Sequence, residues 1–355
     1  MTAAAQPRDA EAAFRALAAE RILIFDGGYG TAIQKYGLGE ADYRGGLDLA
    51  KDQKGNNDLL CLTRPDIVAA IHTAYLEAGA DMIETNTFSG TRIAMADYGC
   101  EHLVRELNVA AARIARECCD AAAAKDGKRR FVAGAIGPTN KTLSISPDVN
   151  DPAFREVDYD TLKDQYKEQC AALIEGGVDF LLVETCFDTL NAKAAGMAAR
   201  EAEAEAGRSV PLMMSFTITD MSGRNLSGHT VNAFWYSLRH LQPLTIGVNC
   251  AFGADLLRPY LAELAKAADA LILAYPNAGL PNELGQYDEL PATTAALIGE
   301  WVTEGLVNAV GGCCGTTPDH IAAVARAVAG AAPRTLPTVP VVTRLAGLET
   351  MHIAA

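Results

Sequence analysis

The feature that most restricts the fold of this chain is a regular alternation of short apolar runs with longer helical patterns. Eight runs rich in aliphatic residues lie at 22–25, 82–85, 131–136, 180–185, 212–217, 245–249, 270–274 and 307–310. Between them apolar residues repeat at helical spacing, as Ile67, Ile71 and Tyr75 do after Pro65. Parallel strands need such crossover connections, so the alternation predicts a parallel sheet.

Eight strand–helix units favour an α/β fold made of a single (β/α)8 TIM barrel, which we place at residues 21–330. The segments 77–85 and 175–185 repeat one pattern, in which glycine ends a helix and the next strand finishes in Glu-Thr. Residues 1–20 are expected to form an exposed N-terminal helix. Pro333, Pro337 and Pro340 predict that residues 331–355 are an extended tail or inter-module linker. The alternative is an open, doubly wound sheet with two subdomains.

Composition and charge exclude several classes of protein. Apolar residues make up 50% of the chain, which argues against disorder. The 30 Lys and Arg are outnumbered by 44 Asp and Glu, and the net charge of −14 argues against nucleic-acid binding. No apolar run approaches the roughly 20 residues that span a bilayer. With no signal peptide at the N-terminus, we expect a cytoplasmic protein with no membrane partner.

Nine cysteines are the chain's main candidates for chemistry: Cys61, Cys100, Cys118, Cys119, Cys170, Cys186, Cys250, Cys313 and Cys314. An odd number in a long chain does not indicate a disulfide framework. Three of them directly follow predicted strands, Cys250 after the sixth run and Cys313–Cys314 after the eighth. The chemistry of a TIM barrel lies at the carboxyl ends of its strands, so these thiols are expected to meet. The doublet Cys118–Cys119, inside a helical pattern, is interpreted as structural.

Three thiolates would form a zinc site with one open position. Gly311, Gly312 and Gly315 give the doublet a backbone that tolerates positive φ, so both cysteines can reach one ion. Buried packing of these cysteines is an equally open interpretation from spacing alone. A substrate thiol in the fourth position would lose its proton and become a nucleophile. The ligand set therefore favours transfer of a group to sulfur.

Carboxylates also occur at predicted strand ends. Asp26 and Glu184 can bind the ammonium group of an amino acid through charge-assisted hydrogen bonds, and the Gly27 and Gly28 amides can approach a ligand closely. A purely structural role, in which these carboxylates accept hydrogen bonds from backbone amides, is equally compatible with their positions. Glu84 with Asn86, and Asn249 beside Cys250, occupy similar positions.

The segments 26–31, 84–88, 247–250 and 311–315 resemble the zinc-dependent homocysteine S-methyltransferases. The similarity is greatest to the N-terminal homocysteine-binding module of cobalamin-dependent methionine synthase, and it extends over about residues 21–348. The resemblance implies that Cys250, Cys313 and Cys314 bind Zn²⁺, whose fourth ligand is homocysteine sulfur. It also implies that Asp26 and Glu184 hold the amino-acid end, with Gly27, Gly28 and Asn249 close by.

Two departures from the family pattern bear on substrate and donor. Tyr29 stands where the methionine-synthase module usually has Met, beside the pocket. No Asp-x-His-x-x-Gly cobalamin motif and no folate barrel follow, so methylcobalamin is expected from a separate corrinoid protein or as the free cofactor, with a folate-binding methyltransferase module as a further partner. Betaine or S-methylmethionine as donor is the alternative. A non-catalytic zinc-binding subunit of a split methionine synthase is an alternative of another class.

Overall fold

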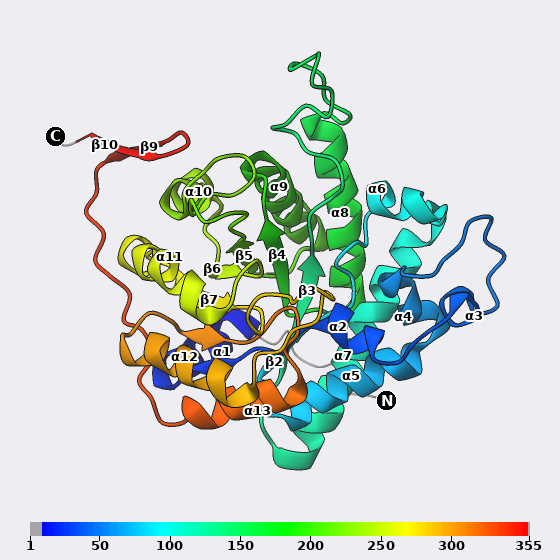
Figure 1. Cartoon of the computed structure of the whole chain (residues 1–355), viewed down its shortest axis with the longest axis horizontal. Coiled ribbons are helices and arrows are strands. Elements are labelled where there is room, and N and C mark those ends of the chain that lie inside the picture. The colour runs from blue at the N-terminus through cyan, green and yellow to red at the C-terminus, as the bar shows by residue number, and fades with distance from the viewer. Residues whose placement is uncertain (1–8, 354–355) are drawn as a thin grey trace.

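The computed structural model describes residues 9–353 and contains a barrel of eight parallel strands (Figure 1). The strands are β1 (Leu23–Ile24), β2 (Met82–Glu84), β3 (Phe131–Ile136), β4 (Phe180–Cys186), β5 (Leu212–Phe216), β6 (Thr245–Asn249), β7 (Leu271–Tyr275) and β8 (Ala309–Val310). They are hydrogen-bonded in the order β1-β8-β7-β6-β5-β4-β3-β2, and a parallel bridge between Phe25 and Met82 joins β1 to β2. The predicted TIM barrel is confirmed, and the alternative of an open sheet is wrong.

One long helix follows each strand and covers the outside of the barrel (Figure 1). These are α5 (Pro65–Glu77), α7 (Val104–Asp126), α8 (Tyr159–Gly176), α9 (Thr189–Ala206), α10 (Val231–Leu238), α11 (Ala254–Ala267), α12 (Pro291–Thr303) and α13 (Pro318–Ala327). Shorter helices interrupt the connections: α2 (Tyr29–Gln34), α3 (Glu40–Arg44), η1 (Asn57–Leu59), α4 (Leu60–Thr63), α6 (Arg92–Met95), η2 (Ala96–Tyr98), η3 (Glu101–Leu103) and η4 (Arg239–Leu241). Most of them lie in the two connections after β1 and β2.

Alternate residues of each strand face two different cores. In β4, Phe180 and Leu182 point into the barrel, whereas Leu181 and Val183 pack against the helices outside. This two-residue period lets one continuous apolar run bury both of its faces. A strand that is buried on both faces therefore appears in the sequence as a continuous apolar run.

Helix α1 (Ala10–Glu20) packs against the interior core of the barrel. Phe14 is fully buried, and its ring lies edge-on to those of Phe131 and Phe180, at centroid distances of 5.6 and 5.3 Å. The expectation of an exposed helix is therefore wrong for the face that includes Ala10, Phe14 and Ala18. A single aromatic residue among alanines gave little sign of this burial. The part of the predicted extension at residues 1–8 lies outside the described residues.

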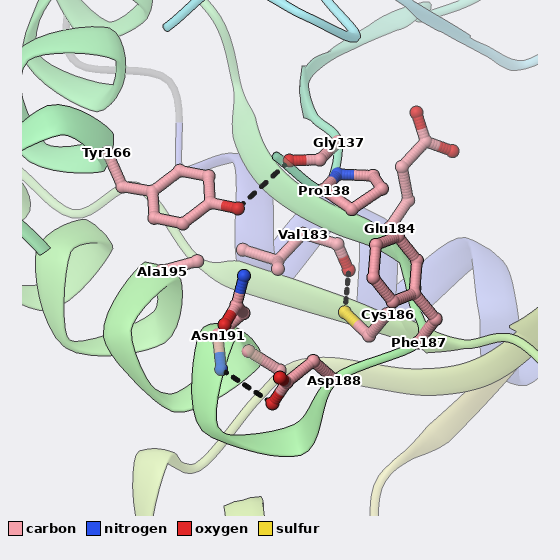
Figure 2. A pocket seen from close by; sticks show the side chains of 11 residues that line it. Gly137, Pro138, Tyr166, Val183, Glu184, Cys186, Phe187, Asp188, Asn191 and Ala195 are labelled. Atoms are coloured by element: carbon pink, nitrogen blue, oxygen red, sulfur yellow. Dashed lines mark hydrogen bonds between the residues drawn. The ribbon is translucent and has the colours of Figure 1, made fainter. Parts of the chain in front are cut away.

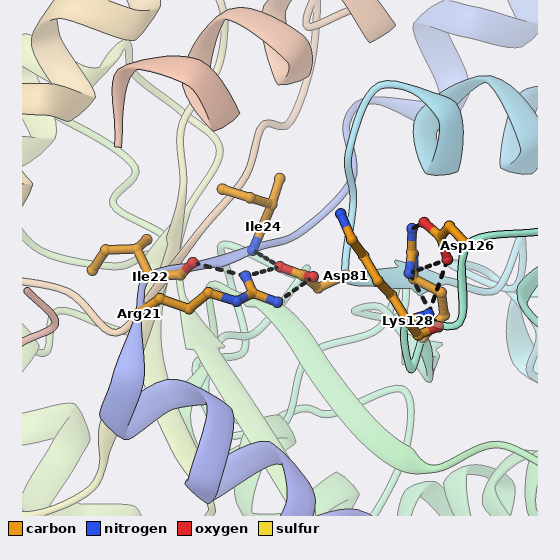
Figure 3. A network of polar contacts seen from close by, with 7 residues as sticks. Arg21, Ile22, Ile24, Asp81, Asp126 and Lys128 are labelled. Carbon is orange, nitrogen blue, oxygen red and sulfur yellow. Dashed lines mark hydrogen bonds and ion pairs between the residues drawn. The ribbon is translucent and has the colours of Figure 1, made fainter. Parts of the chain in front are cut away.

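A partly buried ion pair joins the end of α1 to the start of β1 and β2 (Figure 3). The Arg21 guanidinium donates to both carboxylate oxygens of Asp81 at 2.7 Å, and Asp81 also accepts from the backbone N–H of Ile24 at 2.9 Å. A two-pronged arginine–carboxylate contact fixes geometry as well as contributing energy. It positions the amino ends of these strands, on the side of the barrel away from their polar carboxyl ends.

The C-terminal tail is extended at first and then forms a hairpin. Arg334 is buried and donates to the carbonyl oxygens of Ala265, Ala268 and Ala270, which holds the tail against the end of α11. Strands β9 (Thr343–Ala346) and β10 (Thr350–Ile353) then pair antiparallel beside α10. The sequence predicted the extended stretch but not the hairpin. The domain boundaries at residues 20 and 330 stay a prediction. None of the helices in residues 9–353 is long and apolar enough to span a membrane.

We predict that Phe14→Ala lowers the free energy of unfolding by about 3 kcal/mol or more, because it leaves a cavity in the interior core. Chemical denaturation measures this change. Arg15→Ala is the matched control, since Arg15 is half-exposed and forms an ion pair with Glu11 on the same helix; we expect a change within about 0.5 kcal/mol. Equal effects for the two variants would contradict the placement of α1.

Candidate functional site

Three thiols meet at the carboxyl ends of the strands. Cys250 follows β6, Cys313 and Cys314 follow β8, and their sulfur atoms all lie within 4.8 Å of one another. Cys250 Sγ and Cys314 Sγ are 3.9 Å apart. No other group of three potential metal ligands of this kind occurs in residues 9–353. The structure thus brings together the three cysteines that the sequence singled out.

Backbone geometry turns Cys250 toward its partners. Cys250 and Ala251 have φ values of 60° and 63°, a left-handed conformation that is costly for residues with a Cβ. The Cys250 N–H donates to the carbonyl oxygen of Tyr275 at 3.3 Å, which helps to hold the turn. Strain of this kind, kept at a cluster of reactive groups, is typical of functional sites.

The loop after β8 is held by the loop after β7. The N–H of Cys313 donates to the carbonyl oxygen of Pro276 at 2.7 Å, and the N–H of Cys314 donates to Asn277 Oδ1 at 3.1 Å. On the other side, Thr316 Oγ1 donates to the carbonyl oxygen of Cys313 at 2.6 Å. The two adjacent cysteines of the β8 loop are therefore fixed by hydrogen bonds to the β7 loop and to Thr316.

The glycines around the doublet have two different roles. Only Gly315 has a positive φ, at 79°. A Cβ at Gly311 would lie 2.7 Å from Phe25 Cβ, and one at Gly312 would overlap the side chain of Thr316. The expectation that all three glycines supply positive φ is wrong for Gly311 and Gly312, which instead permit close packing between the β8 loop and its surroundings.

The electrostatics of the cluster favour a cation. Hydrogen bonds from Cys250 and Cys313 to the sulfur of Cys314 lower the pKa of Cys314 to about 3. Hydrogen bonding with Cys250 and Cys314 raises the pKa of Cys313 well above its ordinary value. One of the three thiols therefore loses its proton easily, and the resulting negative charge makes it harder for a second thiol to lose its proton. A bound metal ion would favour the loss of all three protons, because its ligands are thiolates.

The six remaining cysteines pack in the core or between helices. Cys186 lies at the end of β4, where its Sγ approaches the carbonyl oxygen of Val183 at 3.7 Å (Figure 2). The cavity beside it has a volume of about 10 Å³, which leaves room for at most one water molecule. Cys118 contacts Thr73 and the carbonyl oxygen of Ala69, which agrees with its structural interpretation.

A cavity of about 330 Å³ lies beside the thiols. Its wall includes all three cysteines and two carboxyl-bearing residues at or near the carboxyl ends of strands, Glu84 and Glu184. No Lys, Arg or His contributes to the wall among the described residues. The cavity therefore combines soft sulfur ligands with negative charge.

Glu184 is buried at the end of β4, and Tyr275 donates its hydroxyl to Glu184 Oε2 at 3.1 Å. Burial is the main reason that its pKa is raised to about 7. In Figure 2 its carboxyl group points away from the small cavity beside Cys186. Glu184 is thus available to a ligand of the larger cavity.

Asp26 is fully buried behind the cavity rather than in its wall. Its Oδ2 accepts from the backbone N–H of Glu84 at 2.9 Å, and its Oδ1 has no hydrogen-bond partner among the described residues. Burial raises the pKa of Asp26 well above its ordinary value, and the nearby Glu184 adds to the effect. Its assignment to the substrate ammonium stays a prediction.

Asn249 positions a neighbouring strand end. Its Oδ1 accepts from the N–H of Thr185 at 3.1 Å and from Ser215 Oγ at 2.6 Å, and its Nδ2 donates to Thr185 Oγ1 at 2.9 Å. Thr185 has a φ of 54°, so these bonds hold a strained residue of the cavity wall. Asn249 itself does not line the cavity, and its assignment as a substrate contact stays a prediction.

Gly27 and Gly28 both line the cavity. A Cβ at Gly27 would lie 2.8 Å from Thr316 Oγ1, and one at Gly28 would lie 2.5 Å from the carbonyl oxygen of Cys313. The N–H of Gly28 donates to Thr316 Oγ1 at 3.1 Å. These glycines allow the β1 and β8 loops to touch. This close packing alone explains why both positions are glycine, whether or not they contact a ligand. Their predicted substrate contacts remain untested.

Sequence reasoning left several wall residues out of the predicted site, among them Tyr29, Asp58, Glu84 and Tyr98. Tyr29 makes a short hydrogen bond through its hydroxyl to Nδ1 of the buried His72. Glu84 was recognised as a strand-end carboxylate but not assigned to the substrate, although the Glu-Thr pair at 84–85 repeats the pair that contains Glu184. Asp58 and Tyr98 lie in irregular connections, for which strand-end reasoning gives no signal.

A model of the homocysteine S-methyltransferase family matches residues 23–328. The chain belongs to this family. Among solved structures, it is similar to the homocysteine methyltransferase MmuM from Escherichia coli in its metallated form, with 21% identity, a TM-score of 0.69, and coverage of 87% of this chain and 97% of that one. The oxidized form of MmuM gives 21% identity and a TM-score of 0.68, with coverage of 86% and 95%. At this identity the structural likeness shows the shared fold.

We predict that Cys313→Ser lowers the bound zinc of this homocysteine S-methyltransferase to below about a tenth of the protein concentration, because one of three thiolate ligands is lost. Metal analysis after dialysis against a weak chelator measures the content. Cys118→Ser is the control and is expected to retain the ion. Equal zinc in both variants would contradict the assignment of the site.

A second prediction concerns the loop rather than its ligands. Gly312→Ala should weaken zinc binding by about tenfold or more, since the added methyl group displaces Thr316 and with it the cysteine loop. Competition with a chromophoric chelator measures the affinity. Gly299→Ala in α12, where a Cβ meets nothing within 4 Å, should leave zinc affinity unchanged. Unchanged affinity in Gly312→Ala would show that close packing at this glycine is not required.

Proposed function

We propose that this chain makes methionine by transferring a methyl group to homocysteine, with a zinc ion held by Cys250, Cys313 and Cys314. In this proposal the donor is methylcobalamin on a separate corrinoid protein, in a 5-methyltetrahydrofolate–homocysteine methyltransferase system located in the cytoplasm. The main support is one observation: three clustered thiols and two strand-end carboxyl groups share the wall of a single cavity. That combination suits an amino acid that contains a thiol.

The cysteine geometry fits zinc. Bonds of about 2.3 Å from zinc to tetrahedrally arranged sulfurs place those sulfurs about 3.8 Å apart. The 3.9 Å between Cys250 Sγ and Cys314 Sγ agrees with this separation. Zinc bound by three thiolates would accept the substrate thiol as a fourth ligand and favour its deprotonated, nucleophilic form.

The chain's own residues would orient the substrate. Glu184, fixed by its hydrogen bond from Tyr275, offers a carboxylate to the ammonium group of homocysteine. The cavity volume of 330 Å³ equals that of about ten water molecules, which is sufficient for a four-carbon amino acid. Holding both ends of the substrate fixes the direction of the sulfur and lowers the entropic cost of methyl transfer.

The choice of donor rests on the sequence resemblance to the cobalamin-dependent module. A corrinoid is far larger than this cavity, so its methyl group would have to approach from the open mouth, over the cysteines. A separate corrinoid-binding protein would present it there, and a folate-binding methyltransferase module would restore the methyl group afterwards. The chain itself then needs only to bind and orient homocysteine.

A turnover assay with zinc-loaded protein, homocysteine and one methyl donor at a time tests this proposal. We expect methionine to form with methylcobalamin, and the rate to fall by at least about a hundredfold in Cys313→Ser, because the substrate thiol loses its activation. Cys118→Ser should retain the wild-type rate.

Two results would contradict the proposal in different ways. Turnover with betaine or S-methylmethionine, but not with methylcobalamin, would overturn the choice of donor. No turnover with any donor, in protein that contains zinc, would favour a non-catalytic subunit of a split methionine synthase.

A further inference from the structure

We propose that a basic groove at the amino-terminal end of the barrel binds the phosphate group of a small organic anion. The groove consists of two adjoining cavities, of about 590 and 360 Å³, which share Tyr236, Val342 and Arg344 in their walls. Pro243 in its wall precedes β6 and Asp269 precedes β7, whereas the three thiols follow the other ends of the strands. The groove is therefore separate from the proposed homocysteine site.

Positive charge gathers in this groove, although the chain as a whole carries a net charge of −14. Its walls contain four basic side chains from four elements: Arg15 of α1, Arg239 of η4, Lys266 of α11 and Arg344 of β9. Asp269 is the one carboxylate among the described wall residues, and Glu11 pairs with Arg15 from outside the wall. With both carboxylates counted and the wall histidines left out, the groove keeps an excess of two positive charges.

Hydrogen-bond donors outnumber acceptors in the groove. Arg15 and Arg239 each bind one carboxylate, and Nη1 of both has no acceptor among the residues that the structure describes. Trp235 Nε1 and Arg344 Nε are buried and likewise have no partner in residues 9–353. Guanidinium and indole groups can only donate, and leaving a buried donor unpaired is costly. A ligand of this groove therefore has to supply acceptors and negative charge.

Two of the guanidinium groups are held in place by the protein. Arg239 Nε donates to Asp269 Oδ1 at 2.9 Å. Arg344 Cζ lies 5.3 Å from the centroid of the Tyr236 ring, and its Nη2 donates to the carbonyl oxygen of Pro340 at 2.7 Å. The hydrogen bond from Arg239 lowers the pKa of Asp269, and the positive charge of Arg344 adds to this effect. The two guanidinium groups thus lie around one carboxylate, which cannot neutralise both.

Charge and shape favour a phosphate group over a carboxylate. A phosphate monoester carries a charge of about −1.5 to −2 at neutral pH, which matches the excess in the groove. Its three oxygens point in different directions and can accept from donors on different elements, whereas the two oxygens of a carboxylate lie in one plane. The larger cavity equals the volume of about twenty water molecules, which leaves room for an organic group. The bound phosphate would join α1 to the C-terminal tail.

Calorimetric titration of the full chain tests this site. The probes are inorganic phosphate, glycerol 3-phosphate and malonate, a dicarboxylate of similar charge, at an ionic strength kept constant with chloride. We expect glycerol 3-phosphate to bind at least as tightly as inorganic phosphate, and malonate to bind at least about tenfold more weakly than either. Arg15→Gln should weaken binding of both phosphates by about tenfold, the usual effect of a lost charge-assisted hydrogen bond.

Arg92→Gln is the matched control, because Arg92 has a similar side-chain exposure (44%, against 47% for Arg15) and also pairs with a glutamate. It lies in α6, outside the groove, and the substitution should leave phosphate affinity unchanged. Hydrogen exchange gives a second measurement. Phosphate should slow exchange of the β9 amides in the wild-type protein and do so less in Arg15→Gln, since the ligand then loses its link to α1.

Three results would overturn the inference. The first is that neither phosphate binds to the wild-type protein. The second is equal affinity for malonate and the phosphates, which would show that the groove attracts any anion. The third is an equal effect of Arg15→Gln and Arg92→Gln, which would place the bound phosphate elsewhere. The experiment uses no zinc, homocysteine or methyl donor, so its outcome does not depend on the proposed function.

Discussion

The convergence of three sulfur atoms within 4.8 Å is the constraint on which the rest of the site depends. Three thiolates repel one another, so the backbone must hold them together until a cation compensates their charge. The left-handed turn at Cys250 and the hydrogen bonds from Cys313 and Cys314 to the β7 loop do this. The barrel makes the arrangement possible because the carboxyl ends of β6 and β8 open onto the same face.

A second electrostatic element, the carboxyl groups of Glu84 and Glu184, shares the cavity wall with the three thiols. Glu84 and Glu184 are held by secondary structure in a wall without basic side chains, and burial raises the pKa of both. The thiols attract a soft metal ion and the carboxyl groups attract an ammonium group. A thiol amino acid satisfies both ends at once, which is the physical basis for homocysteine as the proposed substrate of this family member.

Sequence reasoning predicted the barrel well because each strand is buried on both faces and so appears as a continuous apolar run. It also found the three cysteines, since they directly follow strands. It failed for α1, where Phe14 is a lone aromatic residue, and for Gly311 and Gly312. Gly311 packs against Phe25, which lies far away in sequence, and Gly312 packs against Thr316 through the fold of the loop itself. It placed Glu84 at the end of a strand but assigned it no ligand, although the Glu-Thr pair at 84–85 repeats the pair that contains Glu184. The Tyr29–His72 contact depends on tertiary packing and left no sequence signal.

The most direct test of the central claim is X-ray absorption at the zinc edge, recorded on the zinc-loaded protein before and after homocysteine is added. Three sulfur ligands at about 2.3 Å are predicted for the protein alone, with a light atom in the fourth position. Homocysteine should raise the count to four sulfurs at an unchanged distance. A first shell dominated by nitrogen and oxygen, or a sulfur count that does not change with homocysteine, would contradict the account.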